Sequence, residues 1–75
     1  MTRKTVNKNN KIGMKIKLER IKLGISQEEL AERAYLNKNT IGLIERGEQS
    51  PTVDTVEAIA NALGLSLQEM FNFNF

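Results

Sequence analysis

The stretch ISQEELAERAYLNKNTIGLIERG, residues 25–47, carries the start signals of two short helices. Ser26 is a favourable N-cap, and Glu29 three positions later predicts a capping box. Asn37 repeats the N-cap signal at the start of the second helix. Hydrophobic staples are expected at both caps, between Ile25 and Leu30 and between Leu36 and Ile41. A connection of about three residues forces the helices to cross steeply, which predicts a helix-turn-helix whose second helix faces a DNA groove.

Three further helices are expected around this stretch, so the sequence predicts an all-α domain of five short helices. Their expected ranges, with those of the two central helices, are about 10–23, 27–34, 38–46, 53–63 and 67–71. Gly24 and Gly64 are expected to end the first and fourth helices, and Ser66 with Glu69 predicts another capping box. The apolar positions expected to face the core are Ile12, Ile16, Leu18, Ile21 and Leu23 in the first helix, and Val53, Val56, Ile59, Ala60 and Leu63 in the fourth.

The composition of the 75-residue chain argues against several classes of function. There is no cysteine for a disulfide or a thiolate metal site, and no histidine, the usual general base and commonest zinc ligand. A glycine-rich phosphate loop is also missing. We therefore expect no enzyme, no metal, no cofactor and no small-molecule ligand. No apolar run approaches the roughly 20 residues that span a bilayer, and no secretory signal is recognisable, so we expect a soluble, cytoplasmic protein.

Charge is divided unevenly along the chain. Residues 1–22 hold eight basic residues and one acidic residue, a net charge of +7, whereas residues 23–75 hold three basic and eight acidic residues, a net charge of −5. This asymmetry indicates a polyanionic partner on one side of the molecule, although a solvated basic tail has the same pattern. Residues 1–9 are polar and are expected to form a flexible basic arm. Nonspecific phosphate contacts could come from Arg3, Lys4, Lys8, Lys11, Lys15 and Lys17.

Several elements in the order found here resemble the lambda-repressor-like, Cro-type helix-turn-helix proteins, also called the XRE family. These elements are LGISQEELA, IERG, the Ser-Pro-Thr loop at residues 50–52 and ALGLSLQEMF, and the resemblance covers residues 12–71. It implies a fold of five short helices and a prokaryotic or phage transcription regulator that binds operator DNA as a dimer. We therefore expect residues 10–71 to form the DNA-binding domain.

The first residues of the second central helix are the expected base readers. Lys38, Asn39 and Thr40 face outward, since Ile41 and Ile44 occupy the inward stripe. Lys38 can donate to guanine O6 and N7 or to a phosphate, and Asn39 can pair with adenine N6 and N7. The resemblance also implies base contacts at Lys38 and Asn39. The plainer interpretation is that these side chains only solvate the first turn.

Further DNA contacts are expected on both sides of these residues. Leu43 is placed to meet a thymine methyl group or to pad the edge of the core. Gln27 stands at a helix N-terminus, which attracts phosphate, and the resemblance implies a phosphate clamp there. Arg46 is expected to contact a phosphate, although a cation at a helix C-terminus is also favourable without a ligand. Asn37 is first a cap and only secondarily a phosphate contact.

Three features concern the orientation of the second central helix, residues 38–46, which is the expected recognition helix. The resemblance implies an ion pair between Arg20 and Glu45 that joins the first helix to the third. Tyr35 stands where the family usually has glycine, so strain or a shifted turn is expected. Gly42 weakens a helix by about 1 kcal/mol relative to alanine, and either a close approach to the DNA backbone or tolerated drift accounts for it.

The C-terminal residues raise the question of a dimer. Met70, Phe71, Phe73 and Phe75 are expected to form a dimer interface across a twofold axis, with Phe71 also closing the monomer core. A frayed tail at residues 72–75 is the alternative. The sequence therefore predicts a regulator that binds double-stranded operator DNA, an inverted repeat, as a homodimer. Alternatives are the DNA-binding antitoxin or controller of a toxin–antitoxin or restriction-modification operon, and a protein-interaction module that has lost DNA binding.

Overall fold

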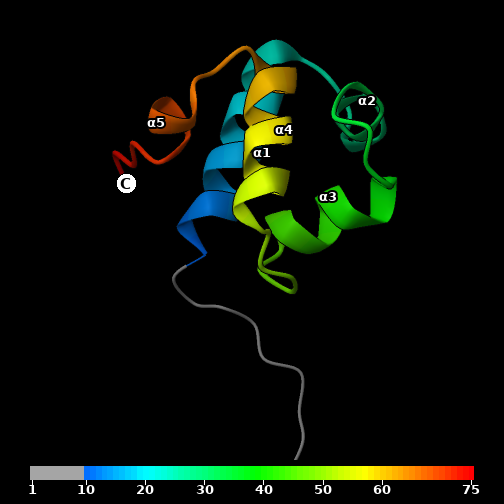
Figure 1. Ribbon diagram of the computed structural model, residues 1–75, viewed down its shortest axis with the longest axis horizontal. Helices are drawn as coiled ribbons and strands as arrows, with labels where there is room; N and C mark the ends of the chain where they lie inside the picture. The colour runs from blue at the N-terminus through cyan, green and yellow to red at the C-terminus, as the bar shows by residue number, and fades with distance from the viewer. Residues whose placement is uncertain (1–9) are drawn as a thin grey trace, which may run out of the picture.

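The computed structural model describes residues 10–75, and this part of the chain contains five α-helices and no strand. The helices are α1 (Lys11–Leu23), α2 (Gln27–Arg33), α3 (Lys38–Glu45), α4 (Val53–Leu63) and α5 (Leu67–Met70) (Figure 1). The predicted all-α class and helix order are confirmed, and the helix ends differ from the expected ones by a residue at most. The basic arm expected at residues 1–9 lies outside the described residues.

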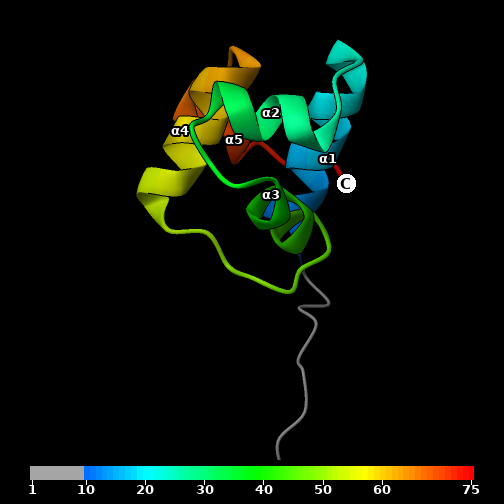
Figure 2. The same cartoon turned by 90° about the vertical axis from the view of Figure 1, so that its right-hand side faces the viewer.

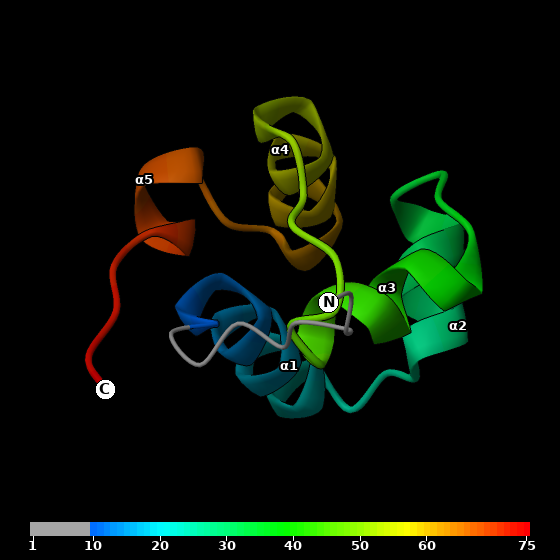
Figure 3. The same cartoon turned by 90° about the horizontal axis from the view of Figure 1, so that it is seen from below.

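Helices α2 and α3 form the helix-turn-helix. Figure 2 shows α2 across the view while α3 points toward the viewer, so the two cross steeply as predicted. α2 packs against α3 and α4, and α1 packs against α3, α4 and α5. Figures 1 and 3 place α5 and the C-terminal end on the opposite side of α1 and α4 from α2 and α3. The outer side of α3 is therefore far from the C-terminal residues.

The core lies where these helices meet and takes at least one side chain from each of them. Its buried apolar members are Ile16, Ile25, Leu30, Ala31, Ala34, Ile41, Ile44, Val56, Ile59, Ala60, Leu63 and Met70. Within residues 10–75 no helix is long and apolar enough to cross a membrane.

The caps follow the sequence signals with one exception. Ser26 Oγ accepts a hydrogen bond from the Glu29 backbone N–H at 3.0 Å, but the Glu29 carboxylate pairs with Arg33 at 2.8 Å instead of returning to the cap. The capping box predicted there is thus only half formed, because Arg33 lies one turn along the same helix face and offers a charged partner. At Ser66 and Glu69 both bonds are present, at 3.0 and 2.7 Å.

The predicted inward face of α1 is wrong in part. Ile16 is fully buried and Ile12 packs against the core, but Leu18, Ile21 and Leu23 are about half exposed. The residues of α1 advance by about 100° each, so Leu18 and Ile21 lie on the side of the helix away from Ile16. The buried residues of α1 are Gly13 and Ile16. Val53, at the first position of α4, is likewise exposed rather than inward.

Met70 and Phe71 each depart from one expected role. Met70 is completely buried and closes the core, whereas Phe71 is 48% exposed. Phe71 therefore does not close the core, and Met70 lies too deep to contact a partner. Neighbouring residues of a helix face different directions, so the burial of Met70 leaves Phe71 on another side of α5.

Tyr35 occupies the turn between α2 and α3 in the left-handed conformation, with φ of 59°, and its side chain is 95% exposed. The backbone of the turn thus keeps the conformation that suits glycine. No packing holds the tyrosine there, so the strain expected from the sequence is uncompensated.

Replacement of Tyr35 by glycine is expected to raise the free energy of unfolding by about 0.5–1 kcal/mol. A left-handed conformation costs a side chain about 1–2 kcal/mol, and the greater freedom of glycine in the unfolded chain offsets part of the gain. Urea denaturation measures the change. Glu32→Gly, at an exposed position of α2, is the control and is expected to lower stability. A lower free energy of unfolding in Tyr35→Gly would contradict the claim that the backbone is strained at Tyr35.

Candidate nucleic-acid interface

Helix α3 is fixed at its start by Asn37, whose side-chain oxygen accepts from the Asn39 backbone N–H at 2.8 Å. Ile41 and Ile44 are fully buried against the other helices. Their burial turns the opposite side of α3 outward, and Lys38 and Asn39 are exposed there. The first turn of α3 therefore presents polar donors and acceptors to solvent, as the sequence predicts.

The outer side of α3 is hollowed. A hollow of about 300 Å³ is lined by Gln27, Lys38, Asn39, Gly42, Leu43 and Arg46; we call it the α3 hollow. It brings together five of the seven side chains predicted to contact bases or to clamp the DNA backbone. Gln27 comes from α2, and the other four come from α3 and its C-cap. Asn37 and Thr40 do not line it. Asn37 is the N-cap of α3, and Thr40 is half-buried.

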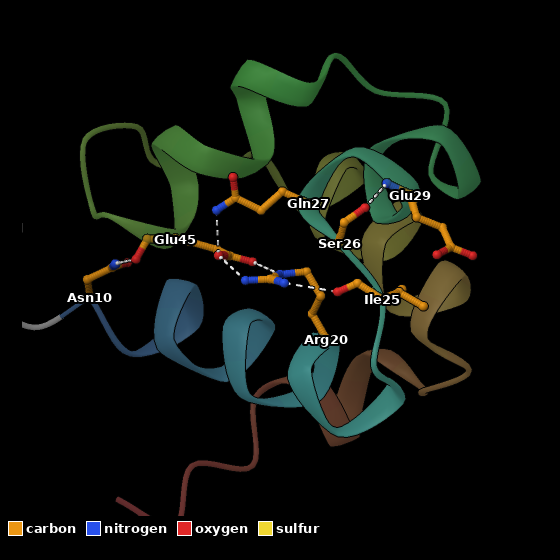
Figure 4. Close-up of polar contacts among 7 residues, drawn as sticks. All are labelled: Asn10, Arg20, Ile25, Ser26, Gln27, Glu29 and Glu45. Carbon is orange, nitrogen blue, oxygen red and sulfur yellow. Dashed lines mark hydrogen bonds and ion pairs between the residues drawn. The ribbon is translucent and has the colours of Figure 1, made fainter.

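The ion pair that the resemblance implied joins α1 to α3 (Figure 4). Arg20 Nε and Nη2 donate to the two carboxylate oxygens of Glu45 at 2.8 and 3.1 Å. The Glu45 side chain is only 2% exposed. Arg20 Nη1 also donates to the Ile25 carbonyl at 2.9 Å, in the connection before α2. A single guanidinium thus ties α1, α3 and the start of the helix-turn-helix together.

Gln27 belongs to the same network, which the sequence did not indicate. Its Nε2 donates to Glu45 Oε1 at 2.9 Å (Figure 4). The Glu45 carboxylate therefore accepts from both α1 and α2 while lying on α3. Because one amide N–H is held in this way, Gln27 has a fixed orientation at the edge of the α3 hollow.

A second connection to α3, also missed from the sequence, comes from Asn10. Its Oδ1 accepts from the Gly13 backbone N–H at 3.2 Å and so caps α1. Its Nδ2 donates to the carbonyls of Ile44 and Glu45, at 3.2 and 3.1 Å, at the end of α3. Helix C-terminal carbonyls lack partners within their own helix. One amide side chain thus caps two helices, and its position as an N-cap of α1 was the only signal available in the sequence.

Gly13 makes this connection possible. A Cβ at Gly13 would clash with the Ile44 carbonyl oxygen and with the Asn10 side chain. The absence of a side chain therefore lets the first turn of α1 approach the backbone of α3 directly. Together, Asn10 and Gly13 fix the C-terminal end of α3, and Arg20, Gln27 and Glu45 fix its inner side.

Comparison with known proteins agrees with this geometry. A helix-turn-helix family model matches residues 16–70, and the chain belongs to that family. The Immunity repressor protein of Bacillus phage phi105 is 38% identical over 56 residues, which cover 75% of this chain but 39% of that protein. This chain thus spans well under half of that repressor's length.

Solved structures of two restriction-modification controller proteins are also similar to this chain. The restriction-modification controller protein C.AhdI from Aeromonas hydrophila aligns with a TM-score of 0.79 and 31% identity, covering 81% of this chain and 92% of that one. The controller protein C.Esp1396I, solved as a tetramer with its natural 35 base-pair operator, aligns with a TM-score of 0.78 and 32% identity over 83% of this chain and 82% of that one. The resemblance noted from the sequence is therefore confirmed.

Proposed function

We propose that this chain is a sequence-specific DNA-binding transcriptional regulator that places α3 in the major groove of an operator. The observation that carries the proposal is the α3 hollow, in which side chains suited to base edges and to phosphates converge on the outer side of the second helix of a helix-turn-helix. The family and fold are those of DNA-binding regulators rather than of enzymes. Such a regulator acts where prokaryotic DNA lies, in the cytoplasm.

Base readout is assigned to the outward residues of α3. Asn39 can pair with adenine N6 and N7, and Lys38 can donate to guanine O6 and N7. Leu43 lines the α3 hollow rather than the core, which supports the thymine-methyl role over that of padding. Thr40 is half-buried and does not line the α3 hollow, so it is a weaker candidate for a base contact.

Phosphate contacts would fix the position of the protein on the duplex. Gln27 is the first residue of α2, where free backbone N–H groups attract an anion. Its amide has a second N–H available beyond the one that Glu45 holds. Asn37 is placed to contact the backbone beside the start of α3. These contacts would give affinity that falls as salt rises.

The operator is proposed to be an inverted repeat bound by a homodimer. The Phe71 and Phe73 rings lie 6.2 Å apart between centroids, and the Phe73 and Phe75 rings 5.9 Å apart. Phe71 and Phe75 are also 48% and 42% exposed. An isologous contact through these three rings would leave α3 free, since the C-terminal end lies on the far side of the molecule (Figure 3).

Asn39→Ala is expected to relax base preference at one base pair of each half-site and to weaken binding by about 1–3 kcal/mol. The cause is the loss of two hydrogen bonds to one adenine edge. Both effects are measured by competition binding, in which single-base-pair variants compete with a site selected from a random DNA duplex pool. Gln27→Ala is the matched comparison and should weaken binding to all these sites similarly. An unchanged base preference in Asn39→Ala would remove it from the readout.

A narrower function is also proposed: the controller of a restriction-modification operon. The likeness to C.AhdI and C.Esp1396I supports it, because the chain covers most of each controller. The genes that flank this one decide the point. A neighbouring endonuclease and methyltransferase pair would support a controller, whereas a toxin gene or phage genes would assign the regulator to those contexts.

A further inference from the structure

Arg46 does not extend away from the end of α3. It is the C-cap of that helix, and its Nη1 lies 2.9 Å from the place that a Cβ on Gly42 would occupy. The guanidinium therefore reaches back along the outer side of α3 by one helical turn and lies over Gly42. This position brings the guanidinium from the end of the helix to the α3 hollow, which Arg46 and Gly42 both line.

Arg46 also shares a helix face with the expected base readers. Asn39, Leu43 and Arg46 are spaced at i, i+4 and i+7, which places them in one row, and all three line the α3 hollow. Gly42 lies beside this row and contributes no side chain. The glycine thus opens the surface at the one point where the guanidinium comes to rest.

Glu48 holds the guanidinium in an orientation suited to reading a base. Arg46 Nε donates to Glu48 Oε2 at 2.9 Å, and the two terminal nitrogens remain for another partner. A carboxylate next to the guanidinium repels a fully charged DNA phosphate more strongly than it repels the partial charges of a neutral base edge. Guanine offers two acceptors, O6 and N7, which match the paired donors of an arginine.

We propose that Arg46 is a specificity-determining residue that reads a guanine in the major groove, and that Gly42 provides the space for it. The inference rests on the proposed function and assigns a further base reader to the same surface. It replaces the expectation that Arg46 contacts only a phosphate. It also gives the glycine in α3 a role, because any larger residue would displace the guanidinium.

The test compares base preference in four chains: the wild type, Arg46→Ala, Gly42→Ala and the double variant. Each is used to select sites from a random DNA duplex pool, and the affinities for single-base-pair variants of the wild-type site are then measured. At one guanine the wild type is expected to discriminate by about tenfold or more. In Arg46→Ala and Gly42→Ala that preference should largely disappear, while preference at the other positions persists.

The double variant separates displacement of Arg46 from other effects of the added methyl group. If Gly42→Ala acts by moving Arg46, the double variant should show no further loss beyond Arg46→Ala. Arg33→Ala, which removes an arginine of α2 that does not line the α3 hollow, is the control and should leave base preference unchanged. Folding of Gly42→Ala is preserved, because only the flexible end of Arg46 has to move.

Two results would overturn the inference while leaving the proposed function intact. The first is that Arg46→Ala binds every sequence more weakly by the same factor and with a shallower salt dependence, as expected for a phosphate contact. The second is that Gly42→Ala keeps the full guanine preference. A wild-type protein that selects no sequence at all would instead contradict the proposed function itself.

Discussion

Glu45→Ala is expected to lower the free energy of unfolding by about 3–5 kcal/mol, the usual cost of leaving one partner of a buried ion pair without the other. Its carboxylate is the acceptor for Arg20 and for Gln27, and the pair lies at the junction of three helices. Small domains have about 0.05–0.15 kcal/mol of stability per residue, so this substitution removes much of the total. Urea denaturation followed by circular dichroism measures the loss.

The matched control removes both charges at once. Arg20→Met combined with Glu45→Leu replaces the pair by apolar groups of similar size, which often restores stability. The double variant should therefore be more stable than Glu45→Ala. A loss below about 1 kcal/mol in Glu45→Ala, within the range of an exposed pair, would show that the pair does not hold α3 in place.

Gly13→Ala is expected to lower the free energy of unfolding by about 1–3 kcal/mol, the cost of overpacking. The added methyl group would meet the Ile44 carbonyl and the Asn10 side chain. The loss is expected even though alanine favours a helix over glycine by about 1 kcal/mol, because a backbone carbonyl cannot move aside as a side chain can.

Gly42→Ala provides the matched comparison for stability. It too replaces a helical glycine, but the nearest atom is the end of the flexible Arg46 side chain. Its free energy of unfolding should rise by up to about 1 kcal/mol, because alanine favours a helix over glycine and no rigid atom opposes the added methyl group. Thermal or urea unfolding of both variants under one condition tests the contrast. Equal changes in the free energy of unfolding for Gly13→Ala and Gly42→Ala would contradict the close approach of α1 to α3.

The helix ends were predictable because their signals are local. Ser26, Asn37 and Ser66 each cap a helix through a backbone N–H two or three residues away. Gly24 and Gly64 adopt the left-handed conformation expected of a helix stop. Each signal involves neighbours in the chain, so the sequence carries it directly, and the helix-turn-helix follows from their spacing.

The contacts that orient α3 were less accessible to sequence reasoning. The bond from Asn10 to the Glu45 carbonyl joins residues 35 positions apart, and the bond from Gln27 to the Glu45 side chain joins residues 18 apart. No local pattern marks such pairs. The exposed side of α1 was missed for a similar reason, because alternative apolar stripes on one helix can be told apart only once the packing partners are known.

Among the site residues, Gly42 and Arg46 show where more could have been predicted. Their i, i+4 spacing places both on one face of α3, and a glycine there leaves room for the long side chain to fold back. The ion pair with Glu48 depends on the path of the chain after Gly47, where φ is 76°. That path is a local turn at the end of α3, but the pairing of the guanidinium with Glu48, and so its orientation, follows only from the geometry of the turn.

The central claim is that α3 reads DNA sequence, and selection of bound duplexes from a random pool at near-physiological salt tests it most directly. We predict an enriched inverted repeat whose half-sites lie about one helical turn apart. An adenine at the position read by Asn39 and a guanine at the position read by Arg46 should appear in each half-site. Absence of enrichment, together with weak binding that disappears as salt rises, would leave only nonspecific phosphate attraction and would contradict the claim.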